Sequence, residues 1–155
     1  MNKIPPPSFD WMLEQCKDDP VLFNDMILHR HPYWPRQAEA ARAVPRYHDT
    51  VIYSGNAVGK DYLVAGLVPW WLWTRPDSLV IVTGPSQTVL GSITWKEIQR
   101  AIAGAGLTLD AQISKGIRVS PHIVRLANGW HALGFSTTTI ERASGHHARD
   151  VLVIV

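Results

Sequence analysis

The stretch that decides the fold reads Ser54-Gly55-Asn56-Ala57-Val58-Gly59-Lys60-Asp61. The apolar run 50–53 before it has the composition of a buried strand, and residues 62–68 after it have the composition of a helix. Glycines let successive backbone N–H groups turn toward one anion, and the start of a helix adds a partial positive charge. Lys60 is placed to reach the terminal phosphates of a nucleotide. The sequence therefore predicts a phosphate-binding loop between a strand and a helix.

The match to the P-loop pattern G-x-x-x-x-G-K-[ST] is partial. Ser54 occupies the position of the first glycine, and Gly55 lies too close to Gly59 to replace it. Asp61 occupies the position of the Ser or Thr that normally binds magnesium. An Asp is still a hard oxygen ligand, so Asp61 is a candidate Mg²⁺ ligand. The alternative is a structural turn that caps a helix and binds nothing.

Gln37 is a candidate for contacting the base of the nucleotide. It lies at the start of a helix predicted for residues 37–44. A side-chain amide offers one donor and one acceptor, which matches the N6 and N7 edge of adenine. The alternative is an ordinary solvated glutamine on a helix, and the sequence leaves both open.

Composition narrows the class of protein. The chain has 155 residues, of which 46% are hydrophobic and 18% charged, so a globular domain with a real core is expected. A net charge of +2 is too small to indicate nucleic-acid binding by itself. Cys16 is the only cysteine, which excludes an internal disulfide and fits a reducing compartment. The histidine pairs 29/31 and 146/147 lack partners at metal-ligand spacing and are interpreted as surface or turn residues.

No segment has the pattern of a signal peptide or a membrane span. The N-terminal residues 1–7 contain no apolar core. The most apolar run, 62–73, is about half the length that a membrane helix needs. It is therefore expected to be a core helix. The first interpretation of the tryptophans in 70–73 is that they are core residues, and the second is that they form a surface on which bases stack.

The predicted fold class is α/β, with a parallel sheet of the P-loop NTPase type flanked by helices. Residues 1–31 are expected to form a helical lead-in, with helices at 9–16 and 21–28, and residues 32–155 the ATPase domain. A buried strand at 78–83, a turn at 84–87 and a helix at 88–103 indicate a right-handed crossover. Ligands gather at the carboxyl ends of such strands, where both 55–61 and 84–87 are expected.

The C-terminal third predicts a hairpin and a last strand. Strands are expected at 117–120, 123–127 and 130–135, with a hairpin turn at Asn128-Gly129. A short helix at 140–143, capped from the run 136–139, and a turn at 144–147 are expected to precede a buried parallel strand at 150–155. A P-loop hydrolase needs carboxylates at the end of such a strand. The expectation is that the chain stops just before them; the alternative is that this strand is only core.

Four segments, in this order along residues 32–155, resemble the large terminase subunit of tailed phages. They are Trp34-Pro35-Arg36-Gln37, the loop 54–61, Val82-Thr83-Gly84-Pro85-Ser86-Gln87 with Trp95-Lys96-Glu97-Ile98, and Ser144-Gly145-His146-His147-Ala148 before 151–155. Each segment alone is a weak signal, and the ordered set is more specific.

The resemblance implies an ATPase, using ATP and Mg²⁺, that drives double-stranded DNA into a preformed capsid. It implies that 55–61 is the phosphate loop with Lys60 on the β- and γ-phosphates, that Gln37 contacts adenine, and that 84–87 lies near the ATP site and DNA. It also implies a homo-oligomeric ring acting with the portal and the small terminase subunit in the host cytoplasm, without a membrane, and a nuclease domain that is not in this chain.

One departure from the family concerns charge. Many family members carry Arg where this chain has Asn56, so the resemblance leaves that charge to another arginine, for instance one from a neighbouring subunit.

Two other functions stay open: a different nucleic-acid-dependent P-loop ATPase such as a helicase, and a scaffold that binds nucleotide or DNA without hydrolysis. Asn56 and Asp61 are the features that favour the scaffold.

Overall fold

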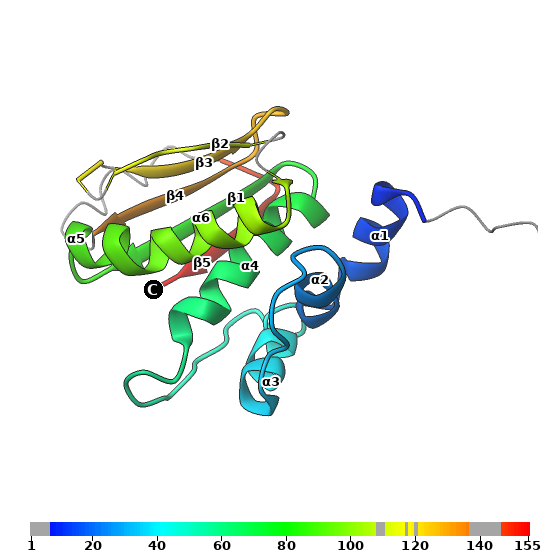
Figure 1. Cartoon of the computed structure of the whole chain (residues 1–155), viewed down its shortest axis with the longest axis horizontal. Helices are drawn as coiled ribbons and strands as arrows, with labels where there is room; N and C mark the ends of the chain where they lie inside the picture. The colour runs from blue at the N-terminus through cyan, green and yellow to red at the C-terminus, as the bar shows by residue number, and fades with distance from the viewer. Residues whose placement is uncertain (1–6, 108–110, 117, 120, 137–146) are drawn as a thin grey trace, which may run out of the picture.

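The computed structural model describes residues 7–107, 111–116, 118–119, 121–136 and 147–155. It is a mixed α/β structure in which helices pack on a five-stranded sheet of order β2-β3-β4-β1-β5 (Figure 1). The elements are α1 (Phe9–Cys16), α2 (Pro20–Met26), α3 (Pro35–Ala43), α4 (Lys60–Thr74), β1 (Ser78–Gly84), α5 (Gln87–Val89), the π-helix η1 (Leu90–Thr94), α6 (Trp95–Gly104), β2 (Ala111–Ile113), β3 (His122–Leu126), β4 (His131–Ser136) and β5 (Asp150–Ile154).

The sheet joins a parallel part to an antiparallel hairpin. Strand β1 is parallel to β4 on one side and to β5 on the other, with Leu79 opposite His131 and Val151. Strand β3 is antiparallel to β2 on one side and to β4 on the other. The hairpin predicted at Asn128-Gly129 is confirmed, and Gly129 has the left-handed φ of 94° that such a turn favours. The hairpin extends the sheet through β4.

The main core lies between the sheet and the helices α4 and α6. Helix α4 has no polar face, because it is surrounded by the sheet, α6 and the N-terminal helices (Figure 1). Trp70 and Trp95 are almost completely buried in this core. The first interpretation of the tryptophans on α4, as core residues, is therefore confirmed for Trp70 and Trp73.

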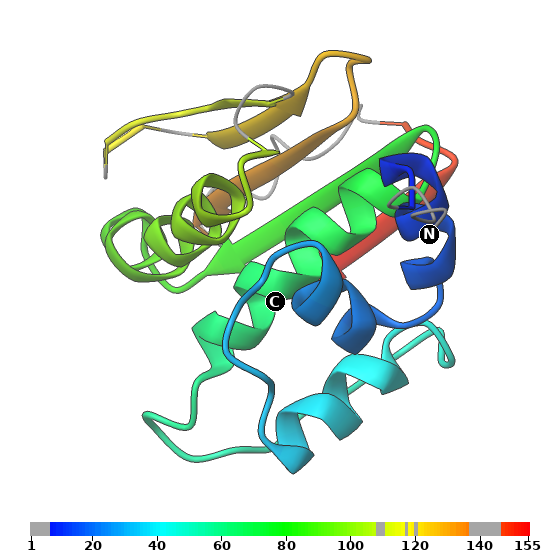
Figure 2. The same cartoon turned by 45° about the vertical axis from the view of Figure 1, so that its right-hand side comes forward.

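The N-terminal helices pack on α4, and the first two are each capped by the side chain that precedes their first residue. The Ser8 hydroxyl accepts a hydrogen bond from the Trp11 N–H at the start of α1, and the Asp19 carboxylate caps α2. The Trp70 indole N–H donates to the carbonyl of Cys16 over 2.9 Å, which ties α1 to α4. Figure 2 shows α1, α2 and α3 beside α4, on the side away from the sheet. The predicted division at residues 31/32 stays a prediction.

The strand predicted at 50–53 is wrong. These residues form no strand, and Val51, Ile52 and Tyr53 are 75%, 44% and 94% exposed. A β-branched composition supports a strand only where a neighbouring strand supplies hydrogen bonds and other side chains cover it, and no described strand pairs with these residues. The loop 54–61 is consequently not at the end of a strand, whereas the turn 84–87 does follow β1.

Three further expectations need correction. Strand β5 is parallel to β1 but is not buried: it lies at the edge of the sheet, and Val151 and Val153 are 43% and 55% exposed. The helix predicted at 88–103 is interrupted by the π-helical turn η1. The strand predicted at 117–120 is absent from its two described residues, 118 and 119.

The short helix predicted at 140–143 and residues 144–146 of the turn predicted at 144–147 lie outside the described residues. Among the helices that are described, none combines the length and the apolar character needed to cross a bilayer.

Candidate functional site

The loop 54–61 connects the exposed segment 50–53 to the first turn of α4 (Figure 1). Ala57 and Gly59 have left-handed φ values of 59° and 82°, and Gly59 is the residue that caps α4. Left-handed residues in such a loop turn neighbouring N–H groups to one side, which forms a concave site for an anion. Because α4 begins at Lys60, the helix adds the partial positive charge of its N-terminus at the same place.

Lys60 closes this loop on itself. Its ammonium Nζ donates to the carbonyl oxygen of Gly55 over 2.9 Å, while its side chain remains exposed. The Lys60 ammonium group thus lies across the turn 55–60 and is bound by a neutral acceptor, the Gly55 carbonyl. A phosphate oxygen would be a stronger acceptor for the same ammonium group, because a hydrogen bond between two charged groups is stronger.

Gln37 contacts the loop from the first turn of α3. Its amide nitrogen Nε2 donates to the carbonyl oxygen of Gly59 over 3.0 Å, and its Oε1 accepts from the Trp34 N–H at 3.4 Å. A Cβ added to Gly59 would lie 2.5 Å from Gln37 Nε2, so the glycine allows this close approach. The amide nitrogen is thus directed at the backbone of residues 58 and 59, whereas Oε1 has two acceptor positions and can accept a second hydrogen bond, for example from the adenine amino group, without losing the bond from Trp34.

Asp61, the candidate magnesium ligand, contacts a residue that the sequence analysis did not identify. The hydroxyl of Thr94, at the end of η1, donates to Asp61 Oδ1. The two residues are 33 positions apart, and no spacing rule connects them. No other described residue forms a hydrogen bond with the Asp61 carboxylate, so its second oxygen, Oδ2, can bind another partner.

Arg30, His31 and Tyr62, which the sequence analysis did not identify, join the start of α4 to the connection between α2 and α3. The Arg30 guanidinium donates to the Tyr62 carbonyl over 2.9 Å and lies 3.7 Å from the centre of the Tyr62 ring. The Tyr62 hydroxyl in turn donates to the carbonyl of His31 over 2.7 Å. These contacts fix the helix N-terminus on which the loop depends.

The turn 84–87, which the resemblance places near the ATP site, forms a separate set of contacts. Gln87 Nε2 donates to the Val119 carbonyl over 2.6 Å, and Gln87 Oε1 accepts from the Ser136 N–H over 3.3 Å. Gln87 therefore joins the ends of β1 and β4 to the segment before β3. Within the described chain, no hydrogen bond links the turn 84–87 to the loop 54–61; Thr94, which bonds to Asp61, lies seven residues after Gln87.

Asp61 is the only acidic residue of the loop 54–61. In the part of the chain that the structure describes, no three His, Cys, Asp or Glu side chains gather into a metal-binding cluster. The loop thus offers Mg²⁺ one carboxylate, a number that suits this ion when substrate phosphates and water complete its shell.

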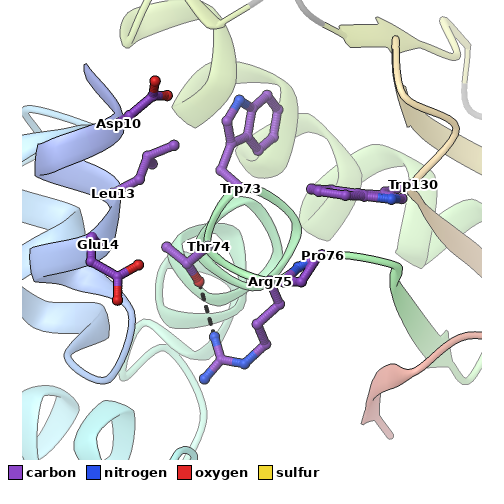
Figure 3. A pocket seen from close by; sticks show the side chains of 8 residues that line it. All are labelled: Asp10, Leu13, Glu14, Trp73, Thr74, Arg75, Pro76 and Trp130. Atoms are coloured by element: carbon purple, nitrogen blue, oxygen red, sulfur yellow. Dashed lines mark hydrogen bonds between the residues drawn. The ribbon is translucent and has the colours of Figure 1, made fainter. Parts of the chain in front are cut away.

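A separate hollow of about 160 Å³ lies at the other end of α4, about 20 Å from the loop at 1.5 Å per helical residue (Figure 3). The residues that line it come from α1, α4 and the β3–β4 hairpin: Asp10, Leu13, Glu14, Trp73, Thr74, Arg75, Pro76 and Trp130. Arg75 is almost buried here, and its guanidinium lies over the rings of Trp70 and Trp71 at 4.2 and 4.0 Å. Burial lowers the pKa of Arg75, and these ring contacts compensate part of the cost of burying its charge. This hollow shares no residue with the loop.

Comparisons of this chain with protein-family models, with curated proteins and with solved structures find no match.

Proposed function

We propose that this chain is the ATP-binding part of a DNA-packaging motor of the large-terminase type, built on a P-loop fold, and that residues 54–61 hold the phosphates of the nucleotide. The observation that carries the proposal is the loop itself. Left-handed residues at 57 and 59 precede a helix N-terminus, and the Lys60 ammonium spans the turn to Gly55. This combination of N–H groups, helix dipole and cation suits an anion of high charge.

The donor set also fits the nucleotide as a whole. When nucleotide binds, Lys60 exchanges the neutral Gly55 carbonyl for negatively charged phosphate oxygens, and the hydrogen bond becomes stronger because both partners are then charged. Gln37 already touches the loop, so a base held beside the phosphates lies within reach of its amide. Asp61 keeps one oxygen for magnesium, and that ion, when bound, neutralises charge on the phosphates.

The remaining parts of the proposal rest on the ordered segments of the resemblance. The motor moves double-stranded DNA and works in a homo-oligomeric ring with the portal and the small terminase subunit, in the host cytoplasm. An arginine from a neighbouring subunit supplies the charge that Asn56 does not.

The test is nucleotide binding by the variant Lys60→Ala. Because a hydrogen bond from an ammonium group to a phosphate contributes about 1.5–3 kcal/mol, we expect ATP affinity with Mg²⁺ to fall at least about tenfold in calorimetry. Lys17→Ala is the matched control, since Lys17 is an exposed lysine directly after α1, and α1 is tied to α4 at Trp70, ten positions along the helix from Lys60. Equal affinity of wild type and Lys60→Ala, or the same loss in Lys17→Ala, would contradict the proposal.

A second candidate function is a scaffold that binds nucleotide or DNA without hydrolysis. The observation in its favour is that Asp61 is the one carboxylate at the loop, with no metal-binding cluster around it among the described residues. Phosphate release from ATP with and without DNA separates the two: turnover stimulated by DNA supports the motor, and tight binding without turnover supports the scaffold.

A further inference from the structure

The hydrogen bond between Thr94 and Asp61 joins the candidate phosphate loop to a different helix. Asp61 lies in the first turn of α4, and Thr94 is the last residue of η1. Its hydroxyl donates to Asp61 Oδ1, and this is the one hydrogen bond that connects these two elements among the described residues. The contact occurs at the residue where the loop departs from the P-loop pattern.

The position of Thr94 is determined by the packing around it. Leu90 and Trp95, at the start of η1 and directly after it, are 2% and 1% exposed, so the backbone between them is held in the core. The π-helical turn inserts one extra residue into the helix and shifts the side chains that follow it around the axis. Thr94 thereby points at α4 from a rigid support.

A threonine has the right chemistry to orient a metal-binding carboxylate. Its hydroxyl is neutral, so it fixes the rotamer of Asp61 without cancelling the negative charge as Lys or Arg would. It occupies one carboxylate oxygen and leaves Oδ2 open. Residues that hold a ligand from behind in this way commonly change metal affinity by about 10- to 100-fold when they are removed.

We propose that Thr94 is a positioning residue that makes nucleotide binding at this loop depend on magnesium. The inference rests on the proposed function. A carboxylate beside the loop repels phosphates unless a cation lies between them, and Thr94 keeps Asp61 where a cation can use it. The P-loop pattern has a Ser or Thr hydroxyl directly after the lysine. In this chain Asp61 stands at that position, and the hydroxyl comes from Thr94, 33 positions later, which bonds to Asp61.

The experiment measures the affinity for ATP by calorimetry, with magnesium and with EDTA, in wild type, Thr94→Val and Thr94→Ser. Thr94→Val keeps the shape and removes the donor, so we expect magnesium to strengthen binding about tenfold less than in wild type. Thr94→Ser keeps the hydroxyl and should restore most of the magnesium effect. Thr88→Val is the control, because Thr88 is an exposed threonine one helical segment earlier.

Lys60→Ala, measured in the same series, separates the two proposals. If Lys60→Ala loses affinity and Thr94→Val responds to magnesium like wild type, Thr94 has no positioning role and the nucleotide site stands. If wild type does not bind ATP, or binds it as Lys60→Ala does, the proposed function fails and the role of Thr94 fails with it. Thermal melting of each variant without ligand shows whether a loss comes from unfolding, and a folded Thr94→Val with normal magnesium dependence is the decisive contrary result.

Discussion

His122 is fully buried on β3, although it is a polar residue. Its ring stacks on the Trp95 ring with 5.3 Å between centroids. Neither nitrogen of the His122 ring forms a hydrogen bond within the described chain. Burial lowers the pKa of His122, and the nearby backbone of Gln87 opposes this shift. A Cβ added to Gly134 would lie 2.7 Å from the Trp95 ring, so the glycine leaves room for the stacked pair. This histidine is therefore held neutral by its surroundings.

We expect the stability of the protein to fall below about pH 6.5 because of His122. The unfolded chain binds a proton at the ordinary histidine pKa, near 6.5, whereas the folded chain resists it. The stability that His122 contributes is thus complete above that pH and is lost as the pH falls toward the lowered pKa of the folded state. Urea unfolding from pH 7.5 to pH 5 measures this slope.

His122→Leu is the comparison for that slope. An apolar side chain of similar volume leaves no unpaired ring nitrogen, so the variant should remain folded and depend less on pH. Equal slopes in the two proteins would show that His122 does not titrate with unfolding.

At the scale of the element, α4 depends on its small residues as much as on its large ones. Gly66 faces the connection between α2 and α3, and a Cβ added there would lie 1.9 Å from the Tyr33 hydroxyl oxygen. The same hydroxyl group donates to the Leu63 carbonyl, and burial raises the pKa of Tyr33. A glycine inside a helix costs about 0.5–1 kcal/mol relative to alanine, so its place here reflects this close approach.

Gly66→Ala is expected to destabilise the protein by about 1–3 kcal/mol, because the buried Tyr33 ring must move away from α4. Gly104→Ala, on α6, is the control: nothing lies within 4 Å of its added Cβ, and alanine favours the helix. Chemical unfolding measures both. A Gly66→Ala protein as stable as Gly104→Ala would mean that the contact with Tyr33 is not tight.

At the scale of the whole molecule, one edge of the sheet is an apolar strand. Among the described residues, β5 pairs with β1 and with no other strand, and its Val151 and Val153 side chains are exposed. The segment 51–53 adds further exposed apolar surface. Unpaired edges with apolar side chains are the places where sheets pair with other chains.

Val153→Lys is therefore expected to reduce self-association, since a lysine on an edge strand discourages pairing with a second chain. Sedimentation velocity over a range of protein concentrations measures the effect. Val89→Lys, at an exposed position of α5, removes apolar surface without touching the edge. If both variants reduce association equally, general hydrophobicity and not the β5 edge is responsible.

The sequence by itself determined the elements whose signals are local. Ser8 and Asp19 cap helices through their own side chains, Asn128-Gly129 turns a hairpin, and the apolar run at 78–83 forms a strand, because each depends on neighbours within a few residues. It also indicated that Gln37 and the loop 54–61 belong together, and the two are in contact. Whether they bind ATP stays a prediction.

Only the tertiary structure decided which strands pair and which side chains meet across the fold. Residues 50–53 and β5 have similar β-branched sequences, yet only β5 has a partner strand, because strand formation depends on hydrogen bonds from distant residues. Asp61 meets Thr94 because a π-helical turn and the packing of α6 on α4 bring them together. No local pattern encodes a contact that depends on how two helices are packed.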